Sequence, residues 1–112
     1  MKNTLIAIAS DVMGAGDDVL GKRLMQSFIF ALSQADDLPN GMVFYNTGAL
    51  LTVEGSESLA DIKMLESAGV EILTCGTCLK HFDVESKLQV GIQTNMYTIL
   101  EKQMSADKVV RP

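Results

Sequence analysis

The two cysteines of this chain, Cys75 and Cys78, enclose Gly76 and Thr77 in a Cys-x-x-Cys motif. Residues 70–74 before the motif are mainly β-branched and apolar, which predicts a short buried strand, and the residues after Cys75 can begin a helix. A cysteine at a helix start lies near free backbone N–H groups and the positive end of the helix dipole, which favour thiolate over thiol. Because the thiolate is the nucleophile, we expect a reactive sulfur at the end of this strand.

The motif has four interpretations: a redox dithiol, a persulfide carrier, half of a zinc site, or two inert buried thiols. A zinc site needs about four ligands, and only His81 stands near the pair, so zinc would have to be shared between subunits. We therefore expect no metal and no cofactor. Thioredoxin-type proteins place the motif after an early strand and opposite a cis-proline loop, for which neither Pro39 nor Pro112 is suitably placed. Dithiol exchange, persulfide transfer and an inert pair all stay open on these grounds.

Several residues in the expected loops could contact a substrate or a small anion beside the cysteines. The candidates are Gly14, Gly16, Asn46, Gly76, Thr77 and Asn95. Backbone N–H groups of the Gly14-x-Gly16 loop could hold an anion, although the loop lacks the third glycine of a dinucleotide fingerprint and the Gly-Lys-Ser/Thr of a P-loop. Turn geometry and helix capping are alternative roles for the same residues. Lys80 and His81 could stabilise a thiolate, or could equally be solvated polar residues.

The composition indicates one globular domain over residues 1–112, with 47% hydrophobic residues and a net charge of −5. The acidic balance, the 5% aromatic content and the absence of tryptophan argue against nucleic-acid binding. No apolar run is long enough to span a bilayer, and the apolar start has no convincing signal-cleavage site. Two cysteines so close together cannot join distant parts of a secreted fold. We therefore expect a cytoplasmic protein that binds neither nucleic acid nor membrane.

Strand and helix patterns alternate along the whole chain. We expect strands at residues 4–9, 42–45, 70–74, 87–90 and 108–111, and long helices at residues 18–35, 57–68 and 96–104, with Asp17 or Asp18, Ser56 and Asn95 as the N-caps. This alternation predicts an α/β fold in which a mostly parallel five-stranded sheet is covered on both faces, in three α/β/α layers. The loops 11–17, 46–55, 75–78 and 92–95 then share the carboxyl edge of the sheet, where such folds place their chemistry.

The first long helix is more apolar than one buried face requires. We expect its core stripe to be formed by Val19, Leu20, Leu24, Phe28, Ala31, Leu32 and Ala35. The run at residues 28–32 is apolar on nearly every side, and we interpret the surplus as a contact between subunits.

Five blocks of the sequence resemble the DsrE/DsrF-like sulfur-relay family, and most closely the C-terminal domain of YedF-type, sulfurtransferase-like selenium-metabolism proteins. The resemblance extends over nearly the whole chain and rests on residues 17–25, 44–48, 73–79, 89–91 and 94–97. The Cys-Gly-Thr-Cys block and the Gly-x-x-Thr-Asn-Met-Tyr block are the more specific ones. The resemblance implies a flavodoxin-like α/β/α fold and a homo-oligomer or a related complex.

The resemblance also implies a sulfur carrier in which the strand-end cysteine, Cys75 here, holds a persulfide. Cys78 has no general counterpart in the family and could resolve that persulfide by forming a disulfide. YedF-type proteins usually carry a preceding TusA-like domain, which this sequence does not contain, so the implied partner is a TusA-like domain or protein outside it. The expected function is therefore sulfur relay, with a link to selenium metabolism as a finer expectation. The alternatives are a cytosolic dithiol oxidoreductase and a non-catalytic oligomeric binding module whose cysteines are inert.

Overall fold

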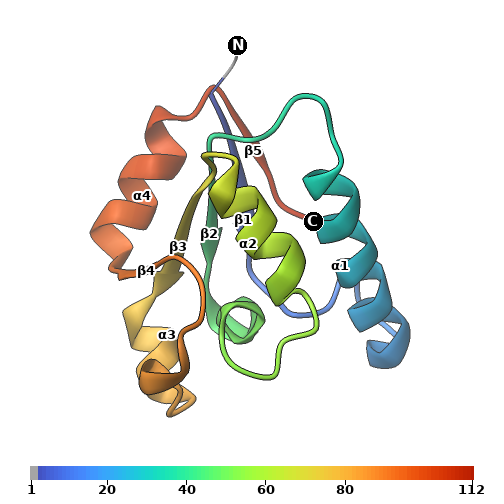
Figure 1. Ribbon diagram of the computed structural model, residues 1–112. Coiled ribbons are helices and arrows are strands. Elements are labelled where there is room, and N and C mark those ends of the chain that lie inside the picture. The colour runs from blue at the N-terminus through green and yellow to red at the C-terminus, as the bar shows by residue number, and fades with distance from the viewer. Residues whose placement is uncertain (1–2) are drawn as a thin grey trace.

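A five-stranded sheet lies at the centre of the computed structural model, which describes residues 3–112 (Figure 1). The strands are β1 (Thr4–Ile8), β2 (Gly41–Phe44), β3 (Glu71–Cys75), β4 (Ile92–Thr94) and β5 (Lys108–Val110). Their order is β4-β3-β2-β1-β5, and all neighbouring pairs are parallel. The carboxyl ends of all five strands therefore meet at one edge of the sheet.

Helices cover both faces of this sheet and make the expected three layers. The connecting helices are α1 (Asp18–Ser33), η1 (Asn46–Thr52), α2 (Leu59–Ser67), α3 (Gly76–His81), η2 (Glu85–Lys87) and α4 (Met96–Ser105), where η denotes a 3-10 helix. On one face α1 and α2 pack against the sheet through Met25, Ile29, Ile62 and Leu65. On the other face α4 packs through Ile99, while α3 extends from the end of β3 (Figure 1).

The ends of the long helices agree with the capping residues expected from the sequence, with one exception. Asp17 caps α1 by accepting a hydrogen bond from the Leu20 N–H at 2.9 Å, and Asn95 caps α4 through the Thr98 N–H at 3.0 Å. Ser56 was expected to cap α2, but α2 begins two residues later than expected and Ser58 precedes it without a side-chain capping bond. The Ser56 hydroxyl instead accepts a hydrogen bond from the Ser58 N–H at 3.2 Å, which moves the helix start along the chain.

The buried face of α1 differs from the predicted stripe. Gly21, Met25 and Ile29 face the core, whereas Val19, Leu20 and Leu24 are exposed. A Cβ at Gly21 would lie 2.9 Å from the Val12 Cβ, so the first turns of α1 approach the preceding loop closely. This contact rotates the helix and turns its early apolar residues outward. The run at residues 28–32 is also partly core, because Ile29 is fully buried there and Phe28 and Leu32 pack against the core cluster.

The segment after β2 is a buried 3-10 helix rather than the loop expected there. Within η1 the Thr52 hydroxyl donates to the Ala49 carbonyl at 3.0 Å and lies 2.9 Å from the Thr74 hydroxyl. Both threonine side chains are fully buried. The pair therefore links η1 to the end of β3, at the residue directly before Cys75.

The fourth strand lies later in the chain than the sequence predicted. Residues 87–90 contain the end of η2 and irregular backbone, and pairing with β3 begins only at Ile92. Gly91 has a φ of 69°, and a Cβ there would overlap the carbonyl oxygen of Ile72. The chain thus turns tightly against β3 at Gly91 before it can join the sheet, which only glycine permits at no steric cost.

Candidate functional site

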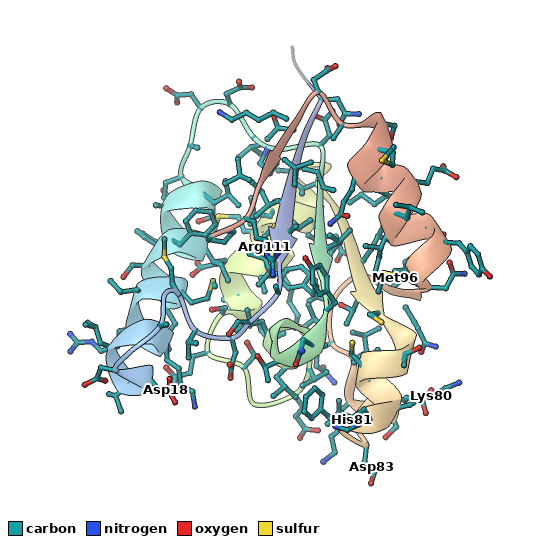
Figure 2. The ribbon with its side chains drawn as sticks, turned by 180° about the vertical axis from the view of Figure 1, so that it is seen from behind. Asp18, Lys80, His81, Asp83, Met96 and Arg111 are labelled. Carbon is teal, nitrogen blue, oxygen red and sulfur yellow. The ribbon has the colours of Figure 1, made fainter. Side chains whose placement is uncertain are left out.

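Cys78 opens into a pocket at the carboxyl edge of the sheet. The pocket has a volume of about 440 Å³ and is lined by Tyr45, Asn46, Thr77, Cys78, His81, Phe82 and Met96. These residues come from the segment after β2, from α3 and its C-cap Phe82, and from the first residue of α4. In Figure 2 the labelled Lys80, His81 and Asp83 lie together at the end of α3, and Met96 marks the start of α4 above them. The walls are mainly apolar and aromatic.

A backbone donor is directed at the Cys78 sulfur. The Asn46 N–H lies 3.1 Å from Cys78 Sγ, which is within hydrogen-bond distance for nitrogen and sulfur. Asn46 has a φ of 53°, in the left-handed region that asparagine enters more easily than most residues other than glycine. This conformation begins η1 at the end of β2, and it brings the main chain rather than the asparagine side chain to the sulfur.

Cys75 lies behind Cys78 and is closed to solvent. It ends β3 with 2% of its surface exposed and belongs to the core cluster beneath α4, against which Cys78 also packs. Both thiols are free. A small reagent that enters the pocket therefore meets Cys78 first, with Cys75 as the second sulfur.

The surroundings of Cys78 favour its neutral form. Burial is the largest cause that raises the pKa of the Cys78 thiol above its ordinary value, and the adjacent Cys75 thiol raises it further. The Asn46 N–H acts in the opposite direction, because it stabilises charge on the sulfur. The expectation that the helix start would favour a thiolate is wrong for Cys78. This cysteine stands in the first turn of a helix of only six residues, where burial outweighs one backbone donor.

The structure brings only part of the sequence-based candidates to the pocket. Asn46, Thr77 and Cys78 line it, whereas Cys75, which ends β3, and Gly76, which begins α3, do not. Asn95 is one residue away from the lining, but its side chain caps α4.

Gly14 and Gly16 lie elsewhere, in the exposed loop that leads into α1. In Figure 2 the first turn of α1, labelled at Asp18, lies on the other side of the molecule from His81. Both glycines adopt positive φ, 82° and 132°, so they serve the turn before α1. The predicted anion cradle is therefore not beside the cysteines.

The pocket also contains residues that were not among the sequence-based candidates. Tyr45 follows β2 directly, and Met96 follows the Asn95 cap, so both could have been found by taking every residue just beyond a strand end. His81 and Phe82 were harder to find, because their place depends on how α3 turns against η1. Their rings form an edge-to-face contact with centroids 5.0 Å apart.

A second hollow, of about 380 Å³, lies between α1, η1 and the loop before α2. Its lining carries lysines and carboxylates but no cysteine. Within residues 3–112 no group of three or more histidine, cysteine, aspartate or glutamate side chains is arranged to hold a metal ion. In the same part of the chain, no helix is both long and apolar enough to cross a bilayer.

Solved structures share this architecture. The YchN protein from E. coli superposes with a TM-score of 0.69 at 19% identity over 100% of both chains. MTH1491 from Methanobacterium thermoautotrophicum, a protein of unknown function, gives 0.69 at 20% identity over 97% of each chain. BT1422 from Bacteroides thetaiotaomicron, a conserved protein of unknown function, gives 0.63 at 11% identity, covering 98% of this chain and 95% of the other. No protein-family model and no curated protein sequence matches the chain.

The fold is confirmed. Three structures that cover nearly the whole chain, together with the parallel sheet and its two helix layers, establish the flavodoxin-like, DsrE-like α/β/α architecture expected from the sequence. At these identities the likeness concerns the fold alone, and function has to be argued from the site.

Proposed function

We propose that this protein relays sulfur through its Cys-x-x-Cys pair, with Cys78 as the thiol that first meets the donor. One observation carries the proposal: Cys78 opens into a mainly apolar pocket at the carboxyl edge of the sheet, with a backbone N–H on its sulfur and a second thiol behind it. The outer sulfur of a persulfide is polarisable, so an apolar pocket suits it, while the Asn46 N–H stabilises negative charge on the Cys78 sulfur. The DsrE-like fold is compatible with this role.

The sequence resemblance assigned the persulfide to Cys75, and that assignment stays a prediction. The burial of Cys75 weighs against its being the first acceptor, so the proposal exchanges the two roles. The Cys78 thiolate attacks the outer sulfur of a donor persulfide, the donor sulfur–sulfur bond breaks, and the donor leaves as a thiolate. An acceptor thiolate later takes the outer sulfur from Cys78 by the same displacement. Cys75 can instead displace hydrosulfide from the Cys78 persulfide and close a disulfide.

The test is intact mass after incubation with an inorganic polysulfide, for the wild type, Cys75→Ser and Cys78→Ser. We expect the gain of a single sulfur atom in the wild type and in Cys75→Ser, and no gain in Cys78→Ser. A gain that depends on Cys75 alone would return the acceptor role to the strand-end cysteine. No gain in any of the three proteins would reject sulfur relay. A selenium-bearing donor in the same assay tests the finer expectation of a selenium role.

A dithiol oxidoreductase is the second candidate, and the adjacency of the two thiols favours it. The neighbouring Cys75 thiol is among the causes that raise the pKa of Cys78, so the two sulfurs are close enough to interact. This candidate predicts that mild oxidants remove two hydrogens without adding sulfur, and that the disulfide has a potential in the cytosolic range.

We further propose that the donor or acceptor is a TusA-like sulfur carrier and that the chain works as a homo-oligomer. Mixing the persulfidated protein with a purified TusA-like carrier, followed by intact mass of both, tests the first of these. Sulfur that stays on this chain after mixing would exclude that carrier as the acceptor.

A further inference from the structure

The pocket brings the chain's one histidine to the accessible cysteine. Cys78 and His81 are three residues apart on α3, and both side chains line the same pocket. Residues three apart on a helix are neighbours on its surface. The edge-to-face contact between the His81 and Phe82 rings, with centroids 5.0 Å apart, steadies the imidazole at the pocket rim.

A base in this position meets a chemical need of the site. Because burial raises the pKa of Cys78, the thiol holds its proton near neutral pH and is a weak nucleophile until a base removes it. Of the other groups around it, Tyr45 is a phenol and Cys75 is a second thiol, whereas an imidazole is the most common general base in enzymes. The charged residues around α3 are exposed and do not line the pocket; they are Lys80, Asp83, Glu85 and Lys87.

We propose that His81 is the general base that takes the proton of the Cys78 thiol as this sulfur attacks. The proton moves from Cys78 Sγ to the imidazole, while the Asn46 N–H stabilises the negative charge that develops on the sulfur. In the transfer step, which rests on the proposed function, the new sulfur–sulfur bond forms as the donor bond breaks. The departing donor thiolate then recovers the proton from the imidazolium. Atoms and electrons balance without an external oxidant or reductant.

The experiment follows the alkylation rate of Cys78 by iodoacetamide against pH, in a Cys75→Ser background so that one thiol reports. His81→Gln is the test variant, and Lys80→Gln is the matched control, since Lys80 is an exposed cation on the same helix outside the pocket. We expect the alkylation rate of the protein that keeps His81 to rise already near neutral pH, because the imidazole takes the thiol proton. General bases contribute about 10²–10⁴-fold, so we expect His81→Gln to lose that rise and to react at least tenfold more slowly at neutral pH.

A second variant separates proton transfer from simple charge stabilisation. His81→Arg keeps a cation in place but cannot accept a proton, so under the proposal it loses the rise near neutral pH as His81→Gln does. The proposal would be overturned if the parent protein and His81→Gln had the same dependence of alkylation rate on pH. It would also be overturned if His81→Arg restored the full alkylation rate near neutral pH. Lys80→Gln is expected to follow the unmodified profile. Since His81 is exposed, the melting temperature of each variant is expected to stay near that of the parent.

This assay is independent of sulfur transfer. If the protein accepts no sulfur but its alkylation rate depends on His81 as expected, sulfur relay is rejected and the role of His81 as a general base is kept. If the protein accepts sulfur but its alkylation rate does not depend on His81, sulfur relay is kept and the general base is rejected.

Discussion

At the scale of single residues, the main chain of Asn46 contacts the Cys78 sulfur more directly than any charged side chain of the described pocket does. Its N–H is held 3.1 Å from Cys78 Sγ by a left-handed backbone, and such conformations in residues other than glycine cost about 1–3 kcal/mol and gather at functional sites. This geometry distinguishes a main-chain role for Asn46 from the side-chain contact that the sequence suggested.

Asn46→Gly is the variant that separates these roles. Glycine keeps the N–H and adopts positive φ freely, so we expect unchanged sulfur acceptance and a free energy of unfolding equal or higher by up to about 1 kcal/mol. Acceptance is measured by intact mass and stability by urea unfolding. A severalfold loss of acceptance in a stably folded Asn46→Gly protein would show that the asparagine side chain makes the contact.

The raised pKa of Cys78 predicts a stability change at alkaline pH. The pKa of Cys78 is higher in the folded state than in the unfolded state, so the neutral thiol stabilises the fold. This contribution to the unfolding free energy is complete below the unfolded-state pKa, roughly 8.5. It is lost as pH rises through the folded-state pKa. We expect the wild type to lose more unfolding free energy between about pH 7 and about pH 10 than Cys78→Ser does. Other alkaline ionisations are shared by both proteins. Equal losses in urea titrations would contradict the prediction.

At the scale of elements, the position of η1 depends on two buried hydroxyls. Since the Thr52 hydroxyl donates to the Ala49 carbonyl, the hydrogen between the two threonines must come from Thr74. Thr74 needs Thr52 as its acceptor, whereas Thr52 keeps a partner if Thr74 is removed. The link is therefore asymmetric.

Substitution by valine exposes this asymmetry. We expect Thr52→Val to cost about 1–3 kcal/mol, because it leaves a buried hydroxyl unpaired, and Thr74→Val to cost less. The double variant is expected to be more stable than Thr52→Val alone, since no hydroxyl then stays unpaired. Urea unfolding of the four proteins gives the coupling energy. If the two single variants lose the same unfolding free energy and these losses add in the double variant, the hydrogen bond between the two threonines contributes nothing to stability.

Elements that rest on local signals could be predicted from the sequence, and those set by close tertiary approaches could not. Asp17 and Asn95 cap α1 and α4 as expected, since an N-cap needs only the right side chain beside the helix. The strand expected at residues 87–90 was wrong, because its alternating pattern could not reveal the turn that Gly91 makes against β3.

At the candidate site, too, features set by local sequence could be predicted and features set by tertiary packing could not. The Cys-x-x-Cys motif and its place at a strand end could be read from the spacing. Which cysteine faces the pocket could not, since it depends on how α3 turns and on how α4 covers Cys75. Gly14 and Gly16 fail as pocket residues for a related reason, as the loop that contains them packs toward α1 through the hydrogen bond from Met13 N–H to the Gly21 carbonyl.

At the scale of the whole molecule, the two faces of the sheet are unequally covered. Five strands about 4.8 Å apart make a sheet roughly 24 Å wide, whereas a helix with its side chains is about 10–12 Å across. Two helices suit one face, but on the other α4 is the one long helix and α3 adds only Cys78, and Ile92 and Val109 are exposed at the edges. Their registered partners, Leu73 and Leu5, place both on the α4 face.

The outer surface of α4 extends this incompletely covered face. Its exposed apolar residues are Met96, Tyr97, Leu100 and Met104, spaced as one stripe along the helix. The exposed apolar residues of α1 are interrupted by Lys22 and Arg23 instead. A second copy of this chain that buries the α4 stripe would cover the open half of the sheet, so we expect the homo-oligomer to form through α4 rather than through residues 28–32.

Leu100→Glu and Phe30→Glu are matched variants for this expectation. Each places a carboxylate at a side chain that is 55% exposed, on α4 and on α1 respectively, so both monomers are expected to fold. Burying an unpaired charge in an interface is costly, so we expect Leu100→Glu to weaken association at least tenfold in sedimentation equilibrium and Phe30→Glu to leave it unchanged. The reverse result would restore the α1 contact, and a monomeric wild type would mean that the α4 face is covered by a different protein.

Because Met96 belongs both to the stripe and to the cysteine pocket, a copy docked there would also border Cys78, and dissociation by Leu100→Glu should then change the alkylation rate of Cys78.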